Sequence, residues 1–266
     1  MSDTGLERIA AGFQGAAGRA ALMPYLMGGF PTVEASRQIG VAYADAGADL
    51  VELGVPFSDP LADGPVIHAA GTRALREGTT LHHVLEVGMA VAQRVPVVLM
   101  CYSNLVFARG IERLAHEMAA RRISGLIIPD LPLEEAAVVM GVCDAMGIAL
   151  VPLVAPTTPP ERLARIGARA RGFLYTVSVT GTTGERAGSN SAELLARAKA
   201  CTDVPVALGF GISTPEQAAA AADAGADGVI VGSRLVRAAA EADEAGEDPA
   251  AAAGEVVAAL AGGLSR

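Results

Sequence analysis

The stretch Ala44-Asp-Ala-Gly-Ala-Asp-Leu-Val-Glu-Leu-Gly54 returns in a closely similar form as Ala222-Asp-Ala-Gly-Ala-Asp-Gly-Val-Ile-Val-Gly232. In both copies a glycine follows residues that favour the end of a helix, and an apolar run comes next. A glycine at such a helix end adopts the left-handed conformation readily, and a short apolar run suits a buried strand. The repeat therefore predicts two equivalent helix–strand units, although convergence on one favourable connector would give the same pattern.

Six further apolar runs resemble the strands of this repeat, which makes eight in all. They are rich in Val, Leu and Ile without alternating polar residues, which is typical of strands buried on both faces of a parallel sheet. Longer segments with helical spacing separate them, for example 32–46, 133–146 and 159–168. The eight predicted strands are Leu22–Met27, Asp49–Leu53, Pro96–Met100, Leu126–Pro129, Ile148–Leu153, Gly172–Val177, Val204–Leu208 and Gly228–Val231.

Eight strand–helix units in about 250 residues match the size of a closed (β/α)8 barrel, the α/β fold known as the TIM barrel. A doubly wound open sheet is the structural alternative. The segment Leu6–Ala16 predicts an extra N-terminal helix that covers one mouth of the barrel. Because no linker divides the chain, we expect a single (β/α)8 barrel domain over residues 1–266. An Ala-rich tail is expected to be helical again from Ala250, after an acidic interruption at Glu241–Asp248.

The composition limits the classes of partner. Hydrophobic residues make up 52% of the chain and charged residues 18%, and the formal net charge is -9. A surface of that sign repels phosphate backbones and anionic lipid headgroups, so we expect neither nucleic acid nor a membrane as a partner. The N-terminal residues have no secretory pattern, and no apolar stretch approaches the roughly 18 residues of a membrane span. The cysteines Cys101, Cys143 and Cys201 suit reduced thiols, so we expect a cytoplasmic location.

Glycine-rich loops follow three neighbouring strands, at the end where barrels of this kind hold their ligands. These loops are Gly209–Ser213, Val231–Arg234 and Thr180–Gly184. Glycines there let backbone N–H groups approach an anion, and a helix N-terminus adds a favourable dipole. A tight turn after a strand needs glycine in any case, but three such loops together predict a phosphate site. Its expected donors are Gly184, Gly211, Gly232 and Ser233.

Two carboxylates mark a candidate acid–base site after the second strand. Glu52 lies within the apolar run 50–53, where an unpaired carboxylate is costly and desolvation raises its pKa. A carboxyl of that kind suits proton transfer. Asp63 follows in a loop that three prolines stiffen. Alternatives remain open at this stage, since Glu52 could pair with a neighbouring arginine and Asp63 could be a turn residue.

Other catalytic groups are poorly placed in this sequence. The only lysine, Lys199, falls in the helix before the seventh strand, so a Schiff-base aldolase lacks its amine. The four histidines show no metal-ligand spacing around one strand end, so no metal site is expected. An acid–base site beside a phosphate site is the remaining interpretation.

Motifs from Leu22 to Val236 resemble the tryptophan synthase alpha subunit family. The longest and most specific is the run Glu52-Leu-Gly-Val-Pro-Phe-Ser-Asp-Pro-Leu-Ala-Asp-Gly-Pro65. Two positions, Val179 and Thr182, depart from the family pattern in the loop after the sixth strand. The other motifs occur in the family's order and are Met100-Cys-Tyr-Ser-Asn-Leu-Val-Phe107, Pro129-Asp-Leu-Pro132, Gly209-Phe-Gly-Ile212 and Val231-Gly-Ser233.

The resemblance implies a lyase of tryptophan biosynthesis that cleaves indole-3-glycerol phosphate into indole and glyceraldehyde 3-phosphate by a retro-aldol step. Glu52 would be the catalytic acid/base. Asp63 would accept a hydrogen bond from the indole N–H and stabilise positive charge on the ring. The remaining implied substrate contacts are Tyr25, Leu99, Tyr175, Thr183 and Phe210.

The resemblance also implies a partner. A beta subunit that holds pyridoxal phosphate would join this chain in an alpha2beta2 heterotetramer, and this chain itself would carry no cofactor. The implied interface residues are Asp59, Asn104 and Pro132. The rival interpretations are another phosphate-binding barrel (a phosphosugar isomerase or indole-glycerol-phosphate synthase), an indole-releasing lyase that works alone, and a binding-only subunit in which Glu52 is dispensable.

Overall fold

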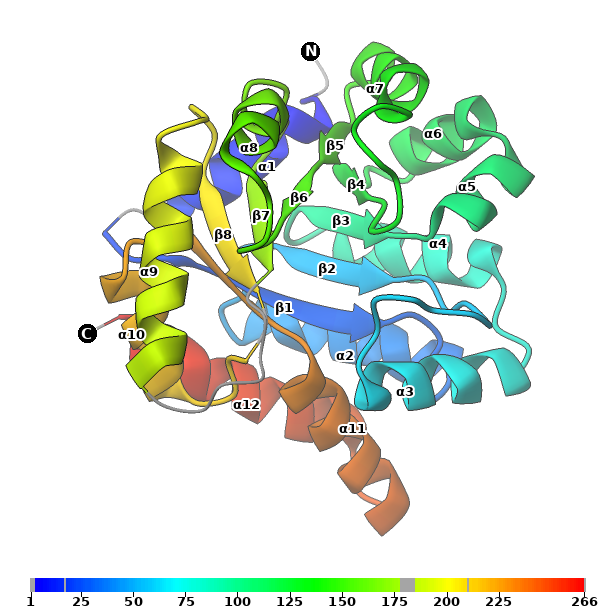
Figure 1. The fold of residues 1–266 in the computed structure, drawn as a ribbon. Coiled ribbons are helices and arrows are strands. Elements are labelled where there is room, and N and C mark those ends of the chain that lie inside the picture. The colour runs from blue at the N-terminus through cyan, green and yellow to red at the C-terminus, as the bar shows by residue number, and fades with distance from the viewer. Residues whose placement is uncertain (1–2, 17, 178–184, 210, 266) are drawn as a thin grey trace.

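The computed structural model describes residues 3–16, 18–177, 185–209 and 211–265, with the backbone alone for 185–190. Its centre is a parallel sheet that curls into a barrel, and the helices lie around it (Figure 1). The strands are β1 (Ala21–Met27), β2 (Val51–Gly54), β3 (Val97–Met100), β4 (Gly125–Ile127), β5 (Ala149–Val151), β6 (Leu153–Val154), β7 (Leu174–Val177), β8 (Val206–Gly209) and β9 (Gly228–Val231).

The strands form a ring in sequence order. The order in the sheet is β5-β4-β3-β2-β1-β9-β8-β7-β6, and the pairing of β1 with β9 joins the first and last strands. β5 and β6 are two parts of the predicted fifth strand, divided at Pro152, which has no N–H for the ladder. The Pro152 carbonyl still accepts a hydrogen bond from the Tyr175 N–H at 3.0 Å, so the chain itself completes the ring. The predicted (β/α)8 barrel is confirmed, and an open doubly wound sheet is excluded.

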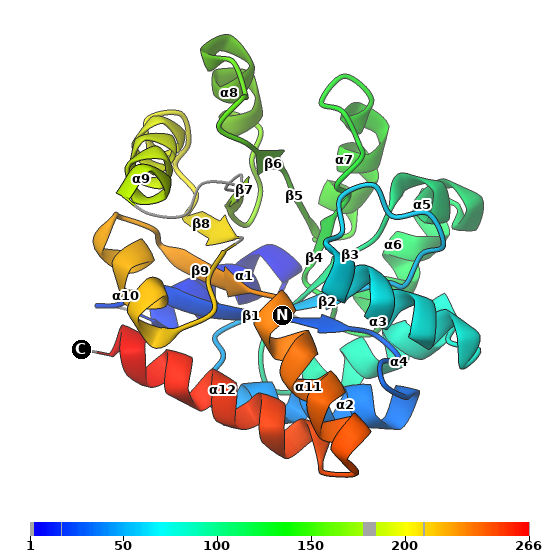
Figure 2. The ribbon, with the colours of Figure 1, turned by 60° about the horizontal axis from the view of Figure 1, so that its bottom comes forward.

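The helices begin and end where the local sequence favours it. Thr32 and Thr214 cap helix N-termini with their hydroxyl oxygens. Gly47, Gly147 and Gly225 follow helices with φ angles of 102°, 66° and 99°, as predicted. α12 lies along α2 and beside α11 (Figure 2). The helices are α1 (Gly5–Gly15), α2 (Val33–Asp45), α3 (Pro65–Arg76), α4 (Leu81–Val91), α5 (Ser103–Arg109), α6 (Ile111–Ala120), α7 (Ala136–Ala145), α8 (Pro160–Gly167), α9 (Glu185–Lys199), α10 (Pro215–Asp223), α11 (Ser233–Ala245) and α12 (Pro249–Leu264).

The aspartate before each strand of the sequence repeat has the same structural role in both copies. The Asp49 carboxylate accepts the Leu22 N–H at 2.8 Å and pairs with an arginine at 2.6 Å. The Asp227 carboxylate accepts the Val206 N–H at 2.8 Å and pairs with Lys199 at 2.7 Å. Each aspartate therefore ties the start of its own strand to the start of the neighbouring strand. The repeat reflects this shared requirement for strand registration.

The core has two layers. Outward-facing strand residues pack against the helices, and inward-facing residues fill the barrel. The extra helix α1 is present as predicted, and its Ile9 is fully buried in the inner layer with Met23, Val98, Ile127 and Phe173. The barrel interior is therefore packed at the end that α1 covers, and the candidate site lies at the opposite end.

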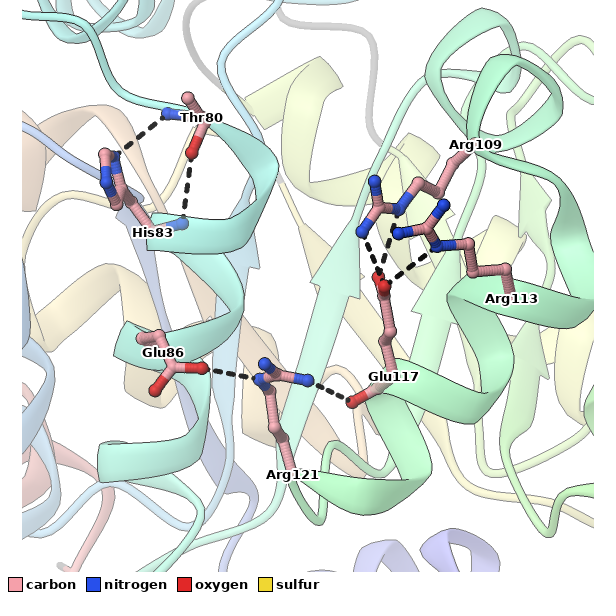
Figure 3. Close-up of polar contacts among 7 residues, drawn as sticks. All are labelled: Thr80, His83, Glu86, Arg109, Arg113, Glu117 and Arg121. Carbon is pink, nitrogen blue, oxygen red and sulfur yellow. Dashed lines mark hydrogen bonds and ion pairs between the residues drawn. The ribbon is translucent and has the colours of Figure 1, made fainter.

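An ion-pair network on the outer surface links α4, α5 and α6 (Figure 3). Arg121, just after α6, donates to Glu86 of α4 at 2.8 Å. Glu117 of α6 accepts from Arg109, the last residue of α5, at 2.5 Å. Arg121 also donates to the Glu117 carbonyl oxygen at 3.2 Å, which joins the two half-buried ion pairs into one network. A network of this kind fixes the orientation of the elements that it joins. It holds in place the short helix α5, whose first turn carries Asn104.

Two predicted boundaries were wrong. α7 begins at Ala136, after a turn, and not at Leu133. The acidic interruption predicted from Glu241 is shorter, because α11 continues to Ala245 and ends at Gly246 with a φ of 73°. Alanine's high helix propensity outweighs the repulsion among the acidic residues there. Among the helices described, none has the length and apolar character needed to cross a membrane.

The burial of Ile9 predicts that α1 stabilises the whole barrel. Ile9→Ala should lower the free energy of unfolding by about 2–4 kcal/mol, because the packed interior cannot collapse fully around the missing atoms. Gln14→Ala, on the exposed side of the same helix, is the matched control and should change this energy by less than about 0.5 kcal/mol. Urea unfolding followed by circular dichroism measures both. Equal small effects would mean that α1 contributes no core packing.

Candidate active site

A cavity of about 550 Å³ opens at the carboxyl ends of the strands. Loops from different strands converge there, which is why barrels of this kind hold their ligands at this mouth. The cavity brings together side chains from the first and last quarters of the chain. The predicted site residues that line it are Tyr25, Glu52, Asp63, Tyr175, Gly211, Gly232 and Ser233.

Glu52 is a buried carboxyl in the middle of β2. Its side chain is 2% exposed, and its Oε2 has no hydrogen-bond partner among the described residues. Burial, with a smaller contribution from the charge of Asp63, raises the pKa of Glu52 from 4.5 to about 8. An arginine partner would have lowered this pKa, so a structural ion pair does not explain Glu52. A carboxyl with this pKa exchanges protons readily near neutral pH.

Asp63 lies in the loop between β2 and α3 and is held by a tyrosine from the next loop. The Tyr102 hydroxyl donates to Asp63 Oδ1 at 2.9 Å and accepts the Ala62 N–H at 3.0 Å. The Tyr102 ring stacks on Phe57 with their centroids 5.2 Å apart. Partial burial raises the pKa of Asp63, although the hydrogen bond from Tyr102 acts in the opposite direction. These contacts fix the orientation of the second carboxyl in the cavity.

Two buried tyrosines accompany Glu52. Tyr25 on β1 is in register with Glu52, and Tyr175 comes from β7. A Cβ on Gly54 would lie 2.0 Å from the Tyr25 hydroxyl, and one on Gly209 would lie 2.4 Å from the Tyr175 hydroxyl. Glycine at these two strand ends therefore leaves room for the rings. Burial, and then the neighbouring negative charge, raises the pKa of both tyrosines, so both stay neutral.

Another wall of the cavity is formed by the starts of α10 and α11. At α10, Thr214 and Gln217 form a capping box that satisfies the first N–H groups. At α11, Gly232 precedes Ser233 without any side-chain cap. An uncapped helix N-terminus offers N–H groups and a positive dipole end to an anion. Gly211, with a φ of 80°, lines the same wall.

The position predicted for Leu99 needs a correction. Leu99 is fully buried between the strand and the surrounding helices, and it does not line the cavity. Successive residues of a strand point to opposite faces, and Val98, which is in register with Glu52, faces the barrel interior. Met100 therefore takes the wall position predicted for Leu99. The predicted Thr183, Gly184 and Phe210 lie outside the described residues.

Sequence reasoning gave no role to several residues that the fold brings to the cavity. Tyr102 is the second residue after β3, and a ring with a hydroxyl so close to the end of a barrel strand is a signal that could have identified it. Arg234 and Arg237 also line the cavity, and their spacing along one helix places them on the same face. Across the described part of the chain, no cluster of three His, Cys, Asp or Glu side chains could hold a metal ion.

The three residues predicted for a partner interface lie after β2, β3 and β4 and are all exposed; they are Asp59, Asn104 and Pro132. Two large apolar side chains close to them in sequence, Leu61 and Phe107, are 86% and 54% exposed. Asp130 accepts the Ser103 N–H at 2.8 Å and the Ser103 hydroxyl at 2.7 Å, which ties the loop after β4 to the start of α5. These loops therefore form one connected surface around the mouth of the barrel.

The fold and the carboxyl pair at its mouth define a (β/α)8-barrel enzyme. A family model described as tryptophan synthase alpha chain matches residues 13–262. The chain belongs to the tryptophan synthase alpha chain family, and it is a carbon–carbon lyase of tryptophan biosynthesis.

Individual relatives and solved structures agree with this membership. The tryptophan synthase alpha chain of Prochlorococcus marinus (strain MIT 9313) is 50% identical over 226 residues, which cover 84% of this chain and 82% of that protein. The Methanosarcina mazei protein of the same name is 53% identical over 220 residues, which cover 82% and 80%. The structure of tryptophan synthase subunit alpha from Legionella pneumophila has a TM-score of 0.90 at 33% identity, covering 99% of each chain. A structure of Mycobacterium tuberculosis tryptophan synthase has a TM-score of 0.88 at 38% identity, covering 97% of this chain and 98% of that one.

The raised pKa of Glu52 predicts a pH-dependent cost to stability. The folded protein keeps the Glu52 proton up to about pH 8, whereas the unfolded chain releases it near pH 4.5. Because the native state binds more protons in this window, the contribution of Glu52 to stability falls as pH rises, by up to about 1.4 kcal/mol per pH unit. Glu52→Gln should remove this slope. Free energies of unfolding of both proteins across the window measure it.

Glu112→Gln is the matched control for this titration. Glu112 is exposed on α6, so its variant should keep the wild-type slope. Parallel stability curves for the wild type and Glu52→Gln would show that Glu52 ionises with an ordinary pKa.

Proposed function

We propose that the protein, as one barrel domain over residues 1–266, cleaves indole-3-glycerol phosphate into indole and glyceraldehyde 3-phosphate. The observation that carries this proposal is Glu52, a carboxyl with a pKa of about 8 in a cavity that it shares with Asp63. Cleavage requires a group that both gives and takes a proton, and a carboxyl whose pKa lies near the working pH does both.

Glu52 moves one proton in a closed cycle. In its protonated form it donates to indole C3, which turns the ring into an iminium cation. The resulting carboxylate removes the proton from the hydroxyl on the adjacent glycerol carbon. The carbonyl of the aldehyde then forms as the carbon–carbon bond breaks, and the bond's electron pair returns to the ring and neutralises the iminium. Glu52 ends the cycle protonated, so no other proton donor is needed.

Asp63 acts on the indole nitrogen. Protonation of C3 places positive charge on the ring, and a carboxylate that accepts the N–H hydrogen bond stabilises this charge as it develops. The hydrogen bond from Tyr102 supports this role because it fixes Asp63 before the substrate binds. Tyr25 and Tyr175 flank Glu52 and exclude water from it. Met100 adds an apolar wall, and the family pattern adds Phe210 and Thr183.

The phosphate of the substrate binds at the start of α11. Gly232 and Ser233 lie at an N-terminus that no side chain caps, and Gly211 lines the same wall. The neighbouring α10 offers fewer donors, because its capping box takes the Thr214 and Gln217 N–H groups and Pro215 has none. Gly184 completes the expected set of backbone donors.

The partner is a tryptophan synthase beta subunit, in an alpha2beta2 assembly within the cytoplasm. Pyridoxal phosphate belongs to that subunit, and this chain uses no cofactor of its own. Asp59, Asn104 and Pro132 contact the partner. Their exposure around the barrel mouth supports this, as does the exposure of Leu61 and Phe107 beside them.

Glu52→Gln should lower indole release from indole-3-glycerol phosphate by at least about a hundredfold, because an amide neither donates nor accepts the proton. The assay follows indole from the purified chain, alone and with the beta subunit. Glu112→Gln serves again as the control and should release indole at the wild-type rate.

Each other result selects a different interpretation. Release that persists in Glu52→Gln would take the acid–base role from Glu52 but keep the reaction. Equal release with and without the beta subunit would identify a lyase that works alone. Absence of release from the wild type under both conditions would reject the lyase activity and leave a binding-only barrel.

The interface proposal predicts a loss of affinity when charge and bulk are added at Asn104. Asn104→Arg should raise the dissociation constant for the beta subunit by about tenfold or more, because Asn104 would be buried at the centre of the contact. Gln14→Arg places the same side chain on α1, at the opposite mouth, and should leave the affinity unchanged. Calorimetric titration measures both constants. Equal constants would move the interface away from α5.

A further inference from the structure

The ionisable side chains that line the cavity are divided by sign. The carboxyls, Glu52 and Asp63, come from β2 and the loop after it. The basic side chains, Arg234 and Arg237, come from the first two turns of α11. The cavity therefore has an acidic region, where the proposed proton transfer occurs, and a basic region beside the uncapped helix N-terminus.

Both arginines are unpaired within the described part of the chain. Many basic residues there form ion pairs, for example Arg73 with Asp243 at 2.6 Å and Arg162 with Glu134 at 2.8 Å. No such pair involves Arg234 or Arg237. Both side chains line the cavity, Arg234 half-buried and Arg237 exposed. A guanidinium at a cavity without a protein anion is a candidate ligand for an anion from outside.

Arg234 also forms part of the boundary between the cavity and a neighbouring groove of about 440 Å³ between α10, α11 and α12. Three carboxylates line that groove, from Glu241, Glu247 and Glu255. None of the ion pairs between described residues joins Arg234 to one of these carboxylates. Its guanidinium is therefore not held by a described carboxylate of the groove, although it lines both the groove and the cavity.

We propose that Arg234 is a direct ligand of the substrate phosphate and that Arg237, one turn further along α11, adds a second positive charge. This inference rests on the proposed function, since it assigns the residues that select a phosphorylated substrate. The two arginines make the enzyme favour indole-3-glycerol phosphate over the unphosphorylated indole glycerol.

The net negative charge of the chain also supports the assignment of Arg234 and Arg237 to the phosphate. The chain carries a net charge of -9, which repels a phosphorylated substrate at long range. Backbone N–H groups and a helix dipole contribute only partial charges, whereas a guanidinium adds a full charge and two parallel donors that match phosphate oxygens. Arg234 is the second residue of α11, so it begins beside Ser233 at the same helix terminus.

The test compares Arg234→Gln, Arg234→Lys and Arg237→Gln with the wild-type chain. Arg76→Gln is the control, since Arg76 is exposed at the end of α3 and does not line the cavity. Binding of inorganic phosphate by calorimetry gives one readout that needs no turnover. Steady-state indole release from indole-3-glycerol phosphate and from indole glycerol gives the second.

Arg234→Gln should raise both the phosphate Kd and the KM for indole-3-glycerol phosphate by about five- to twentyfold, with kcat nearly unchanged. Arg234→Lys should recover part of the affinity, because it keeps the charge but loses the fork of donors. Arg237→Gln should have a smaller effect of the same kind, and Arg76→Gln none. With unphosphorylated indole glycerol as substrate, kcat and KM should be the same for the wild type and every variant.

Failure of this inference is separable from failure of the proposed function. Unchanged phosphate Kd and KM in Arg234→Gln, while the wild type releases indole, would overturn the inference alone. Phosphate binding that depends on Arg234, in a protein that releases no indole, would overturn the proposed function alone. A fall in kcat with unchanged KM, or absence of phosphate binding by the wild type, would also overturn the inference.

Discussion

Closure of a ring of parallel strands is the constraint on which the rest of this protein depends. All strands run in one direction, so all their carboxyl ends reach the same mouth. This is why Glu52 and Tyr175, which are far apart in the chain, share one cavity. The ring is completed by the pairing of β1 with β9 and by the passage of the chain through Pro152 between β5 and β6. α1 packs the other end, which leaves a single direction of approach to the inner carboxyl.

Burial of the Glu52 carboxyl lowers the stability of the folded protein but favours proton transfer. Removing Glu52 from water, with no partner for Oε2 among the described residues, destabilises the native state wherever the group must ionise. The same desolvation brings its pKa to about 8, where a carboxyl both donates and accepts protons. The barrel tolerates this cost because its inner and outer core layers are otherwise apolar and closely packed. Asp63 is more exposed than Glu52, and the Tyr102 hydroxyl fixes its orientation; we propose that it acts on the indole nitrogen.

The N-termini of α10 and α11, at the basic side of the cavity, differ in whether side chains cap them. α10 satisfies its own N-terminus through Thr214 and Gln217, whereas α11 begins at Gly232 with no side-chain cap. We therefore place the anion at α11, and the two arginines that line the cavity lie on that helix. The indole ring would then extend toward the acidic region, with its reacting carbon near Glu52. If the proposed phosphate site is right, the separation of the two signs of charge would orient the substrate before any chemistry begins.

The sequence by itself determined the class of fold, and it predicted several of the residues that line the cavity. Unbroken apolar runs and glycine helix stops reflect local requirements, and the carboxyl at Glu52 stands out because an apolar strand rarely contains one. Only the tertiary structure decided which face each strand residue presents. It turned Leu99 outward and Met100 inward, and it joined Tyr102 to Asp63 across two loops. It also left the start of α11 uncapped beside two arginines. These features depend on barrel register and on contacts between distant segments, which no local pattern of residues specifies.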